Sequence, residues 1–277
     1  MLFYNNKIEK KKKKTKVILI SGDSSGFGLE CSKKLIEEGY IVCGLSRHQF
    51  KLNGLNHYIC DLTKEDEVRQ TIEQIITKYN KIDVLINNAG WGIFGSIEET
   101  SLEQAKRIFD INFFGTFLLT KYVLPYMRNN NYGRIITISS IGGVIPLPFQ
   151  SFYSASKSSL EMLFRALQSE IYTYNIKITL VQPGDARTNF TSNRYSNISE
   201  TSPYKDALNK SIKTISKDES SGFSPTKVSN TINKLIKRKR PPFVVRVGTK
   251  DSLLLTIYKI IPKKIATYLL YKIYASK

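Results

Sequence analysis

Histidine, cysteine and tryptophan are scarce in this chain of 277 residues, which has two, three and one of them. His48 and His57 alone would have to supply every imidazole, so the sequence argues against a histidine-rich zinc site and against a Ser-His-Asp triad. The cysteines, Cys31, Cys43 and Cys60, are odd in number and lie on or beside apolar segments. They favour buried, reduced thiols over a disulfide framework.

Long apolar runs are missing as well. No stretch of about 18 consecutive apolar residues occurs, and no apolar segment of the secretory type follows the N-terminal lysines. The sequence therefore indicates neither a membrane span nor a secretory signal. We expect a cytoplasmic protein, with peripheral contact to a membrane as the alternative.

Acidic residues are few: 23 Asp and Glu stand against 42 Lys and Arg, for a formal net charge of +19. Much of the excess lies in residues 7–16 and 234–240, whereas the middle of the chain mixes both signs. Lys, Asn and Ile are abundant throughout, so solvated lysine explains the charge better than a nucleic-acid interface. We expect no nucleic-acid partner.

Short apolar runs alternate with helical patterns after residues 1–15, a basic tail that we expect to be disordered. This alternation predicts one doubly wound α/β domain over residues 16–248, with a parallel sheet covered on both faces. Residues 185–225 lack a regular pattern and predict a long mobile excursion near the ligand crevice. Strands are predicted at 17–21, 40–45, 82–86, 134–139, 176–181 and 243–247, and helices at 27–38, 64–79, 101–128, 153–174 and 226–237.

The stretch SGDSSGFG, residues 21–28, joins the first predicted strand to the first helix. Gly22, Gly26 and Gly28 would let the backbone approach a pyrophosphate, which the N–H groups of the helix N-terminus could bind. Three glycines at this spacing are a weak signal alone, and the strand-to-helix context strengthens it. A tight turn that binds nothing is the alternative.

Two further strand ends carry polar residues suited to a dinucleotide. GLSRH has no acid to hold ribose hydroxyls, and Arg47 there could pair with the 2′-phosphate of NADP or simply be solvated. In CDLT, Thr63 is placed to cap the next helix, which leaves Asp61 to accept a hydrogen bond from an adenine amino group or to cap as well. NNAG at 87–90 suits either a sharp turn against a flat ring, with Asn amides tying strands together, or a simple loop.

Ser140, Tyr153 and Lys157 form the sharpest constellation. Tyr-x-x-x-Lys places a phenol and an ammonium on one helical face, where the positive charge would lower the pKa of the phenol from about 10. Tyr268 and Lys272 have the same spacing, so spacing alone cannot decide which pair belongs to a functional site. Only the first pair follows a strand that ends in serine, which favours Tyr153 as a proton donor and acceptor.

These motifs, in this order from residue 16 to 247, resemble the short-chain dehydrogenase/reductase family. SGDSSGFG is similar to its cofactor loop, NNAG matches outright, and YSASK, QPGDART and INFFG resemble its other signatures. The resemblance implies a single-domain Rossmann fold that moves a hydride between a nicotinamide cofactor and a CH–OH/C=O pair. It makes Tyr153 the general acid, with Lys157 lowering its pKa and holding the ribose, Ser140 binding the carbonyl oxygen and Asn112 positioning a water.

The resemblance also implies NADP(H) as the preferred cofactor, because GLSRH resembles the NADP-preferring arrangement, with Arg47 present and no acid at Ser46; NAD(H) is the alternative. Ser21 replaces the usual Thr of the family and keeps its hydroxyl. The residues that the resemblance assigns to the cofactor, besides Tyr153 and Lys157, are Gly22, Ser24, Ser25, Gly26, Phe27, Gly28, Arg47, Asp61, Leu62, Asn88, Ala89, Gly90, Pro183, Gly184 and Thr188.

For the substrate, PFQSFYSASKSSLE and the hydrophobic C-terminus resemble the branch with hydroxysteroid and retinol dehydrogenases. This implies a lipophilic ketone, steroid, retinoid or fatty aldehyde and a homodimer or homotetramer. A non-catalytic NADP-binding regulatory protein or a membrane-surface protein is the alternative, and Asp185 after the Pro-Gly pair is unusual for the family. Pocket candidates, which are equally candidates for the core, are Trp91, Ile93, Val144, Leu147, Phe149 and Phe190.

Residues 249–277 form a predicted amphipathic helical extension. Apolar positions follow helical periodicity on both sides of Pro262, which should divide the segment into two short helices. Lysines interrupt the apolar pattern, so the segment cannot span a bilayer, yet lysine and tyrosine beside an apolar stripe are typical of interfacial helices. It is a wall or lid of the substrate pocket, a membrane-docking element or a subunit contact.

Overall fold

Parallel strands form the central sheet of the computed structural model, which describes residues 15–188, 190, 194–196 and 198–276. Within these residues the sheet has seven strands in the order β3-β2-β1-β4-β6-β7-β9. The direction of winding reverses between β1 and β4, and ligands of doubly wound sheets bind beyond the strand ends at that point. The predicted fold class is confirmed. The strands are β1 (Val17–Ser21), β2 (Ile41–Ser46), β3 (Leu55–Ile59), β4 (Val84–Asn87), β6 (Gly133–Ile138), β7 (Ile176–Pro183) and β9 (Val244–Val247).

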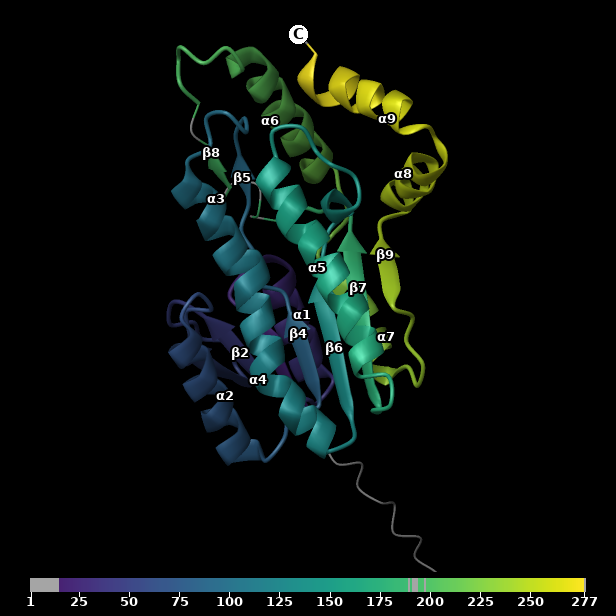
Figure 1. Cartoon of the computed structure of the whole chain (residues 1–277). Helices are drawn as coiled ribbons and strands as arrows, with labels where there is room; N and C mark the ends of the chain where they lie inside the picture. Colours follow the sequence, from purple (N-terminus) through teal and green to yellow (C-terminus); the bar gives the residue numbers. More distant parts are fainter. Residues whose placement is uncertain (1–14, 189, 191–193, 197, 277) are drawn as a thin grey trace, which may run out of the picture.

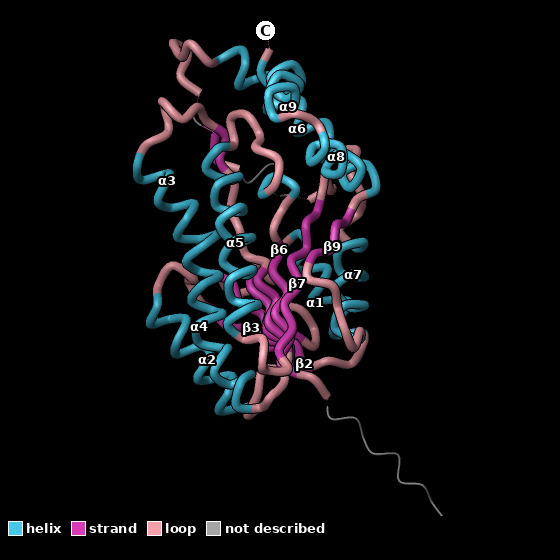
Figure 2. Tube along the Cα trace, turned by 45° about the vertical axis from the view of Figure 1, so that its right-hand side comes forward, coloured by secondary structure: helices cyan, strands magenta, loops and turns pink. Residues whose placement is uncertain are grey.

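Helices cover both faces of the sheet (Figure 2). α1 (Gly26–Glu37) and α7 (Thr226–Lys237) pack against each other and bury one set of apolar side chains on one face. α2 (Glu65–Tyr79), α4 (Gly115–Asn129) and α5 (Ser151–Glu170) bury a second set on the other. All side chains of β1 are buried, which explains its nearly continuous apolar sequence.

The three cysteines lie in this core as buried free thiols, as predicted. Burial raises the pKa of Cys43 to about 12 and that of Cys60 to about 11. A thiolate is therefore disfavoured at both positions near neutral pH, and the cysteines serve as small apolar side chains.

The predicted helix over 101–128 is divided in the structure. α3 (Leu102–Phe109) begins with a capping box formed by Ser101 and Gln104 and leads into a π-helical turn, η1 (Asp110–Phe114), from which α4 continues. A π turn adds a residue to the helix and often marks a functional position. Here it carries Asn112, which is fully buried.

Two predictions about regular structure are wrong. The edge strand β3 was not expected, because its sequence LNHYI is polar and its side chains are only partly buried. Residues 185–225 are not an irregular excursion throughout, because α6 (Lys205–Ser220) lies within them and buries only Leu208, Ser211 and Ile215. Short strands β5 (Ile93–Phe94) and β8 (Tyr195–Ser196) pair in parallel beside it.

The chain ends in α8 (Thr249–Ile260), α9 (Lys263–Leu270) and a second π-helical turn, η3 (Tyr271–Ala275). Pro262 separates α8 from α9, and η3 packs against α6 at the top of Figure 1. No helix in the described ranges is long and apolar enough to cross a membrane. The predicted basic tail falls almost wholly on residues 1–14, outside the described part of the chain.

Candidate active site

The glycine-rich loop between β1 and α1 has the geometry of a phosphate cradle. Gly22 and Gly26 have φ values of 71° and 52°, a region that favours glycine. A Cβ on Gly28 would lie 1.9 Å from the carbonyl oxygen of Gly22, so only glycine permits this close approach. α1 begins at Gly26, so N–H groups of its first turn remain available to an anion. The residues present fit the pyrophosphate of a dinucleotide.

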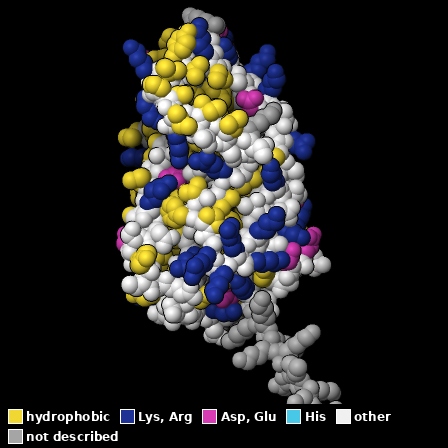
Figure 3. All heavy atoms as spheres, turned by 90° about the vertical axis from the view of Figure 1, so that its right-hand side faces the viewer, with side chains coloured by type: hydrophobic (Ala, Val, Ile, Leu, Met, Phe, Trp, Pro, Cys, Tyr) yellow, Lys and Arg dark blue, Asp and Glu magenta, His cyan; other side chains and the backbone are white. Residues whose placement is uncertain are grey.

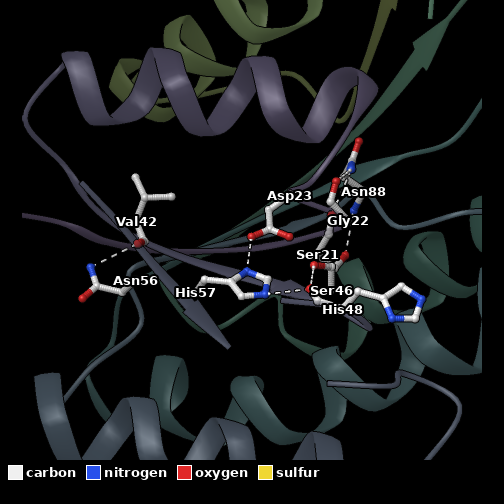
Figure 4. Close-up of polar contacts among 9 residues, drawn as sticks. All are labelled: Ser21, Gly22, Asp23, Val42, Ser46, His48, Asn56, His57 and Asn88. Carbon is white, nitrogen blue, oxygen red and sulfur yellow. Dashed lines mark hydrogen bonds and ion pairs between the residues drawn. The ribbon is translucent and has the colours of Figure 1, made fainter. Parts of the chain in front are cut away.

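Ser21 ties this loop to the NNAG turn after β4. Its hydroxyl accepts hydrogen bonds from the backbone N–H groups of Asn88 (3.0 Å) and Ala89 (3.1 Å). These two contacts require only a hydroxyl group, which serine supplies. The Asn88 amide donates to the carbonyl oxygens of Ser21 and Gly22 (Figure 4). Asn87 donates to Thr120 and Thr137 and joins β4 to α4 and β6, as predicted for the Asn amides.

Ser140, Tyr153 and Lys157 converge where β6 ends and α5 begins. Ser140 caps the 3-10 turn η2 (Ile141–Gly143), and its Oγ accepts the N–H of Gly142 at 3.0 Å. Tyr153 and Lys157 lie one turn apart on α5 and are 7% and 4% exposed. The Lys157 ammonium donates a hydrogen bond to the carbonyl oxygen of Ile138 at 2.9 Å.

The electrostatics of the pair differ from the sequence-based expectation. Burial raises the pKa of Tyr153, and the hydrogen bond from Ser140 and the charge of Arg194 lower it by less. Burial also lowers the pKa of Lys157 from 10.5 to about 8. The Lys157 ammonium lies 6.0 Å from the centroid of the Tyr153 ring. In this structure burial therefore raises the pKa of the Tyr153 phenol by more than the lowering that the Tyr-x-x-x-Lys spacing predicts.

Asn112 holds the backbone of Trp91 in place through hydrogen bonds. Its Oδ1 accepts the N–H of Trp91 at 2.7 Å, and its Nδ2 donates to the carbonyl oxygen of Trp91 and to the Ser156 hydroxyl, both at 3.0 Å. Both protons of the Asn112 side-chain amide are therefore engaged in hydrogen bonds within the protein. A Cβ on Gly90 would lie 3.4 Å from Lys157 Nζ and 3.5 Å from Asn112 Oδ1, so glycine keeps the space between these two groups open.

One pocket joins most of the predicted residues. The predicted catalytic and cofactor residues outside its lining are Ser24, Gly28, Arg47, Asp61, Leu62 and Asn112, and the pocket candidates outside it are Ile93, Val144 and Phe149. The predicted residues that line it are Gly22, Ser25, Gly26, Phe27, Asn88, Ala89, Gly90, Ser140, Tyr153, Lys157, Pro183, Gly184 and Thr188.

Several lining residues were not found from the sequence. Arg194 and Glu219 form a buried ion pair with an N–O distance of 2.6 Å, and the guanidinium lies 4.9 Å from the centroid of the Phe190 ring. Leu254 of α8 and Tyr274 of η3 also line the pocket. No local motif connects these positions with β6 or α5, because only the fold brings them together.

Arg47 and Asp61 lie at the ends of β2 and β3, beside the outer part of the cradle. Arg47 is exposed. Burial raises the pKa of Asp61, but hydrogen bonds from the N–H and hydroxyl of Thr63, with the charge of Arg47, hold it below its usual value. Thr63 does not cap α2 as expected, because the N-cap position is Lys64 and Thr63 bonds to Asp61 instead.

The profile of the family described as short chain dehydrogenase matches residues 16–199. The chain belongs to the short-chain dehydrogenase family. It is 46% identical over 237 residues to a 3-ketodihydrosphingosine reductase of Bacteroides thetaiotaomicron, a match that covers 84% of this chain and 87% of the relative. It is 31% identical over 246 residues to dehydrogenase/reductase SDR family member 7B of Xenopus laevis, covering 83% and 73%.

Solved structures agree with this assignment. A short-chain dehydrogenase from Streptomyces avermitilis matches with a TM-score of 0.80 at 27% identity, covering 93% of this chain and 97% of that one. ElxO with NADP bound matches with a TM-score of 0.69 at 25% identity, covering 84% and 97%.

In this short-chain dehydrogenase the imidazole of His57 links the glycine-rich loop to the loop after β2. His57 of β3 contacts Asp23 of the glycine-rich loop (Nδ1–Oδ2 2.7 Å) and the carbonyl oxygen of His48 after β2 (Nε2–O 3.1 Å), as Figure 4 shows. Asp23 is fully buried, and a Cβ on Gly44 would lie 2.0 Å from its carboxylate. Both ring nitrogens face oxygen atoms, and the tautomer of the ring decides which nitrogen donates.

We expect the substitution His57→Phe to raise the KM for the dinucleotide about tenfold, with kcat at saturation little changed. The reason is that a buried Asp23 carboxylate loses its partner and the two cradle loops lose their link. Initial rates at varied cofactor concentration measure both constants. Asn56→Ala is the control, because Asn56 is on the same strand but bonds to Val42 and Tyr79. An equal rise in KM for Asn56→Ala would contradict the assigned role of His57.

Proposed function

We propose that this short-chain dehydrogenase transfers a hydride between NADP(H) and the carbonyl/alcohol pair of a lipophilic substrate. The observation that carries the proposal is a single pocket lined by the glycine-rich loop and by Ser140, Tyr153 and Lys157. Because the pocket is continuous, the nicotinamide of a dinucleotide whose phosphates bind to the glycine-rich loop would lie beside the hydroxyl groups of Ser140 and Tyr153. Pro183, Gly184 and Thr188 line the same pocket and would hold the nicotinamide half.

The bound dinucleotide would supply the hydride, and the chain would supply donors for the oxygen that becomes negative. The Ser140 Oγ accepts the N–H of Gly142, which helps to hold the hydroxyl in place. Tyr153 would donate its proton to the carbonyl oxygen, and two preorganised hydroxyl groups would stabilise the developing charge. Lys157 would bind the ribose as an ammonium, which is its main form below about pH 8.

Arg47 supports NADP(H) over NAD(H), because a guanidinium binds the 2′-phosphate in bidentate fashion. We expect the unmodified protein to bind NADPH about 10- to 150-fold more tightly than NADH, corresponding to about 1.5–3 kcal/mol for a charged hydrogen-bonded contact. Arg47→Asp should shift the preference toward NADH. Fluorescence titration of both cofactors measures this, and tighter binding of NADH by the unmodified protein would contradict it.

The substrate class is proposed from two observations. The similar protein of B. thetaiotaomicron is named a 3-ketodihydrosphingosine reductase, and the pocket has apolar lining residues, among them Leu147, Phe190 and Ile215, that suit an alkyl chain. Asp218 also lines it and would suit an amino group on the substrate. We therefore propose a long-chain amino ketone.

The test is NADPH oxidation by the purified protein, followed by absorbance, with 3-ketodihydrosphingosine, a steroid ketone and a short aliphatic ketone. The proposal expects turnover with the long-chain ketone at the highest kcat/KM. Turnover only with the steroid would overturn the substrate class. Tight NADPH binding without turnover of any carbonyl would instead support the non-catalytic alternative.

A further inference from the structure

The C-terminal helices expose an unusual number of large apolar side chains. We call the exposed apolar side chains of α8, α9 and η3 the C-terminal face. In Figure 3 hydrophobic side chains gather at the top of the molecule, with lysines beside them. The members of the C-terminal face are all more than 40% exposed; they are Leu253, Leu254, Ile257, Ile260, Ile265, Tyr268, Leu269, Tyr271 and Ile273.

The charged residues within the segment that carries this face have one sign. Residues 252–277 contain no Asp or Glu, and Lys259, Lys263, Lys264 and Lys272 are all exposed. The Lys263 ammonium lies 4.2 Å from the centroid of the Tyr258 ring, so a cation and an aromatic ring stand together at the border. Apolar side chains fringed by lysine and tyrosine match the boundary between acyl chains and anionic headgroups.

The same segment reaches the active site. Leu254 and Tyr274 line the pocket that contains Tyr153 and Lys157, while Leu255 is fully buried. The Lys210 ammonium of α6 donates to the Ser276 hydroxyl at 2.7 Å and holds the end of the segment in place. The C-terminal elements therefore form a wall of the pocket with one side and present an apolar surface with the other.

We propose that the C-terminal face docks in the plane of an anionic bilayer and that an apolar substrate passes from the lipid to the pocket beside Leu254 and Tyr274. Two copies of the chain cannot pair these faces without bringing like charges together, which disfavours self-association. The entry of substrate rests on the proposed function, whereas the docking does not.

The test is co-sedimentation of the full chain with vesicles of phosphatidylcholine alone and of phosphatidylcholine mixed with phosphatidylglycerol. We expect binding to the mixed vesicles and at least about tenfold weaker partitioning for the triple variant Leu253→Gln, Ile260→Gln, Ile265→Gln, because each side chain inserts apolar groups. The matched control replaces Ile97, Leu102 and Met162 by Gln; these are 68%, 70% and 67% exposed and lie outside the face. The control should bind like the unmodified chain.

Three results would overturn the proposal. They are absence of binding to the mixed vesicles, equal binding by the two triple variants, and a fall in molar mass by light scattering on substitution of the face. Equal binding would assign the interaction to residues 7–16, which both variants keep. Thermal unfolding checks that each variant is folded.

Activity separates docking from the proposed function. Reduction of a short, water-soluble ketone should be the same in both triple variants, and reduction of a vesicle-borne long-chain ketone should fall only in the variant of the face. If no ketone is reduced while vesicle binding follows the face, the proposed function fails and docking stands. If both ketones are reduced equally by both variants, the substrate route fails.

Discussion

Replacing Tyr153 by Phe is expected to lower the single-turnover rate of ketone reduction by at least about 100-fold, the lower end of contributions from general acids. The substitution removes one hydroxyl and keeps the ring, which packs 5.8 Å from the ring of Phe190 between centroids. NADPH affinity should remain nearly unchanged, because the glycine-rich loop makes no contact that depends on this hydroxyl. Rapid mixing of the enzyme–NADPH complex with substrate measures the rate.

Tyr268→Phe is the control for this prediction. Tyr268 has the same spacing to a lysine, and the Lys272 ammonium lies 5.7 Å from its ring centroid, but Tyr268 is on α9, 57% exposed and outside the pocket lining. Its hydroxyl should not affect the chemical step on a soluble substrate. Equal losses in both variants would contradict the assignment of Tyr153 as the acid.

Lys157→Met is expected to abolish most turnover and at the same time stabilise the protein near pH 7. Burial holds the pKa of Lys157 at about 8 in the folded state, against 10.5 for the free side chain. This shift costs the folded state about 3 kcal/mol when the lysine is protonated. The lost hydrogen bond to Ile138 offsets about 1 kcal/mol or more of the gain. Urea unfolding should show a net gain of about 1–2 kcal/mol.

The pH dependence of this gain identifies its cause. Between about pH 8 and 10.5 the unfolded chain binds more protons at Lys157 than the folded chain does, so the unmodified protein gains stability as pH rises. Below about pH 8 the lysine is protonated in both states, and the full cost of burying its ammonium lowers the stability of the unmodified protein. The advantage of the Met variant should therefore be greatest near pH 7 and shrink toward pH 10. A variant that is less stable than the unmodified protein at pH 7 would contradict this account.

The sequence predicted the strands that are buried on both faces, because runs such as VILI have no polar side chain. It did not predict β3, whose side chains are only partly buried at the sheet edge, or α6, whose buried positions include a serine. The short motifs identified Ser140, Tyr153 and Lys157 because local chain geometry places them together. Neither the Arg194–Glu219 pair nor the contact between His57 and Asp23 has a local pattern, since both join distant segments.

The position of β9 at the end of the sheet has a consequence for synthesis on the ribosome. β7 is complete at Pro183, but its outer edge pairs only with Val244–Val247, which are made some 60 residues later. Until then the growing chain exposes unpaired backbone groups along a hydrophobic strand, and such edges promote aggregation. The α7 helix, which covers α1, is also made in this interval. This unpaired edge is therefore present late in translation, after Ser140, Tyr153 and Lys157 have already been made.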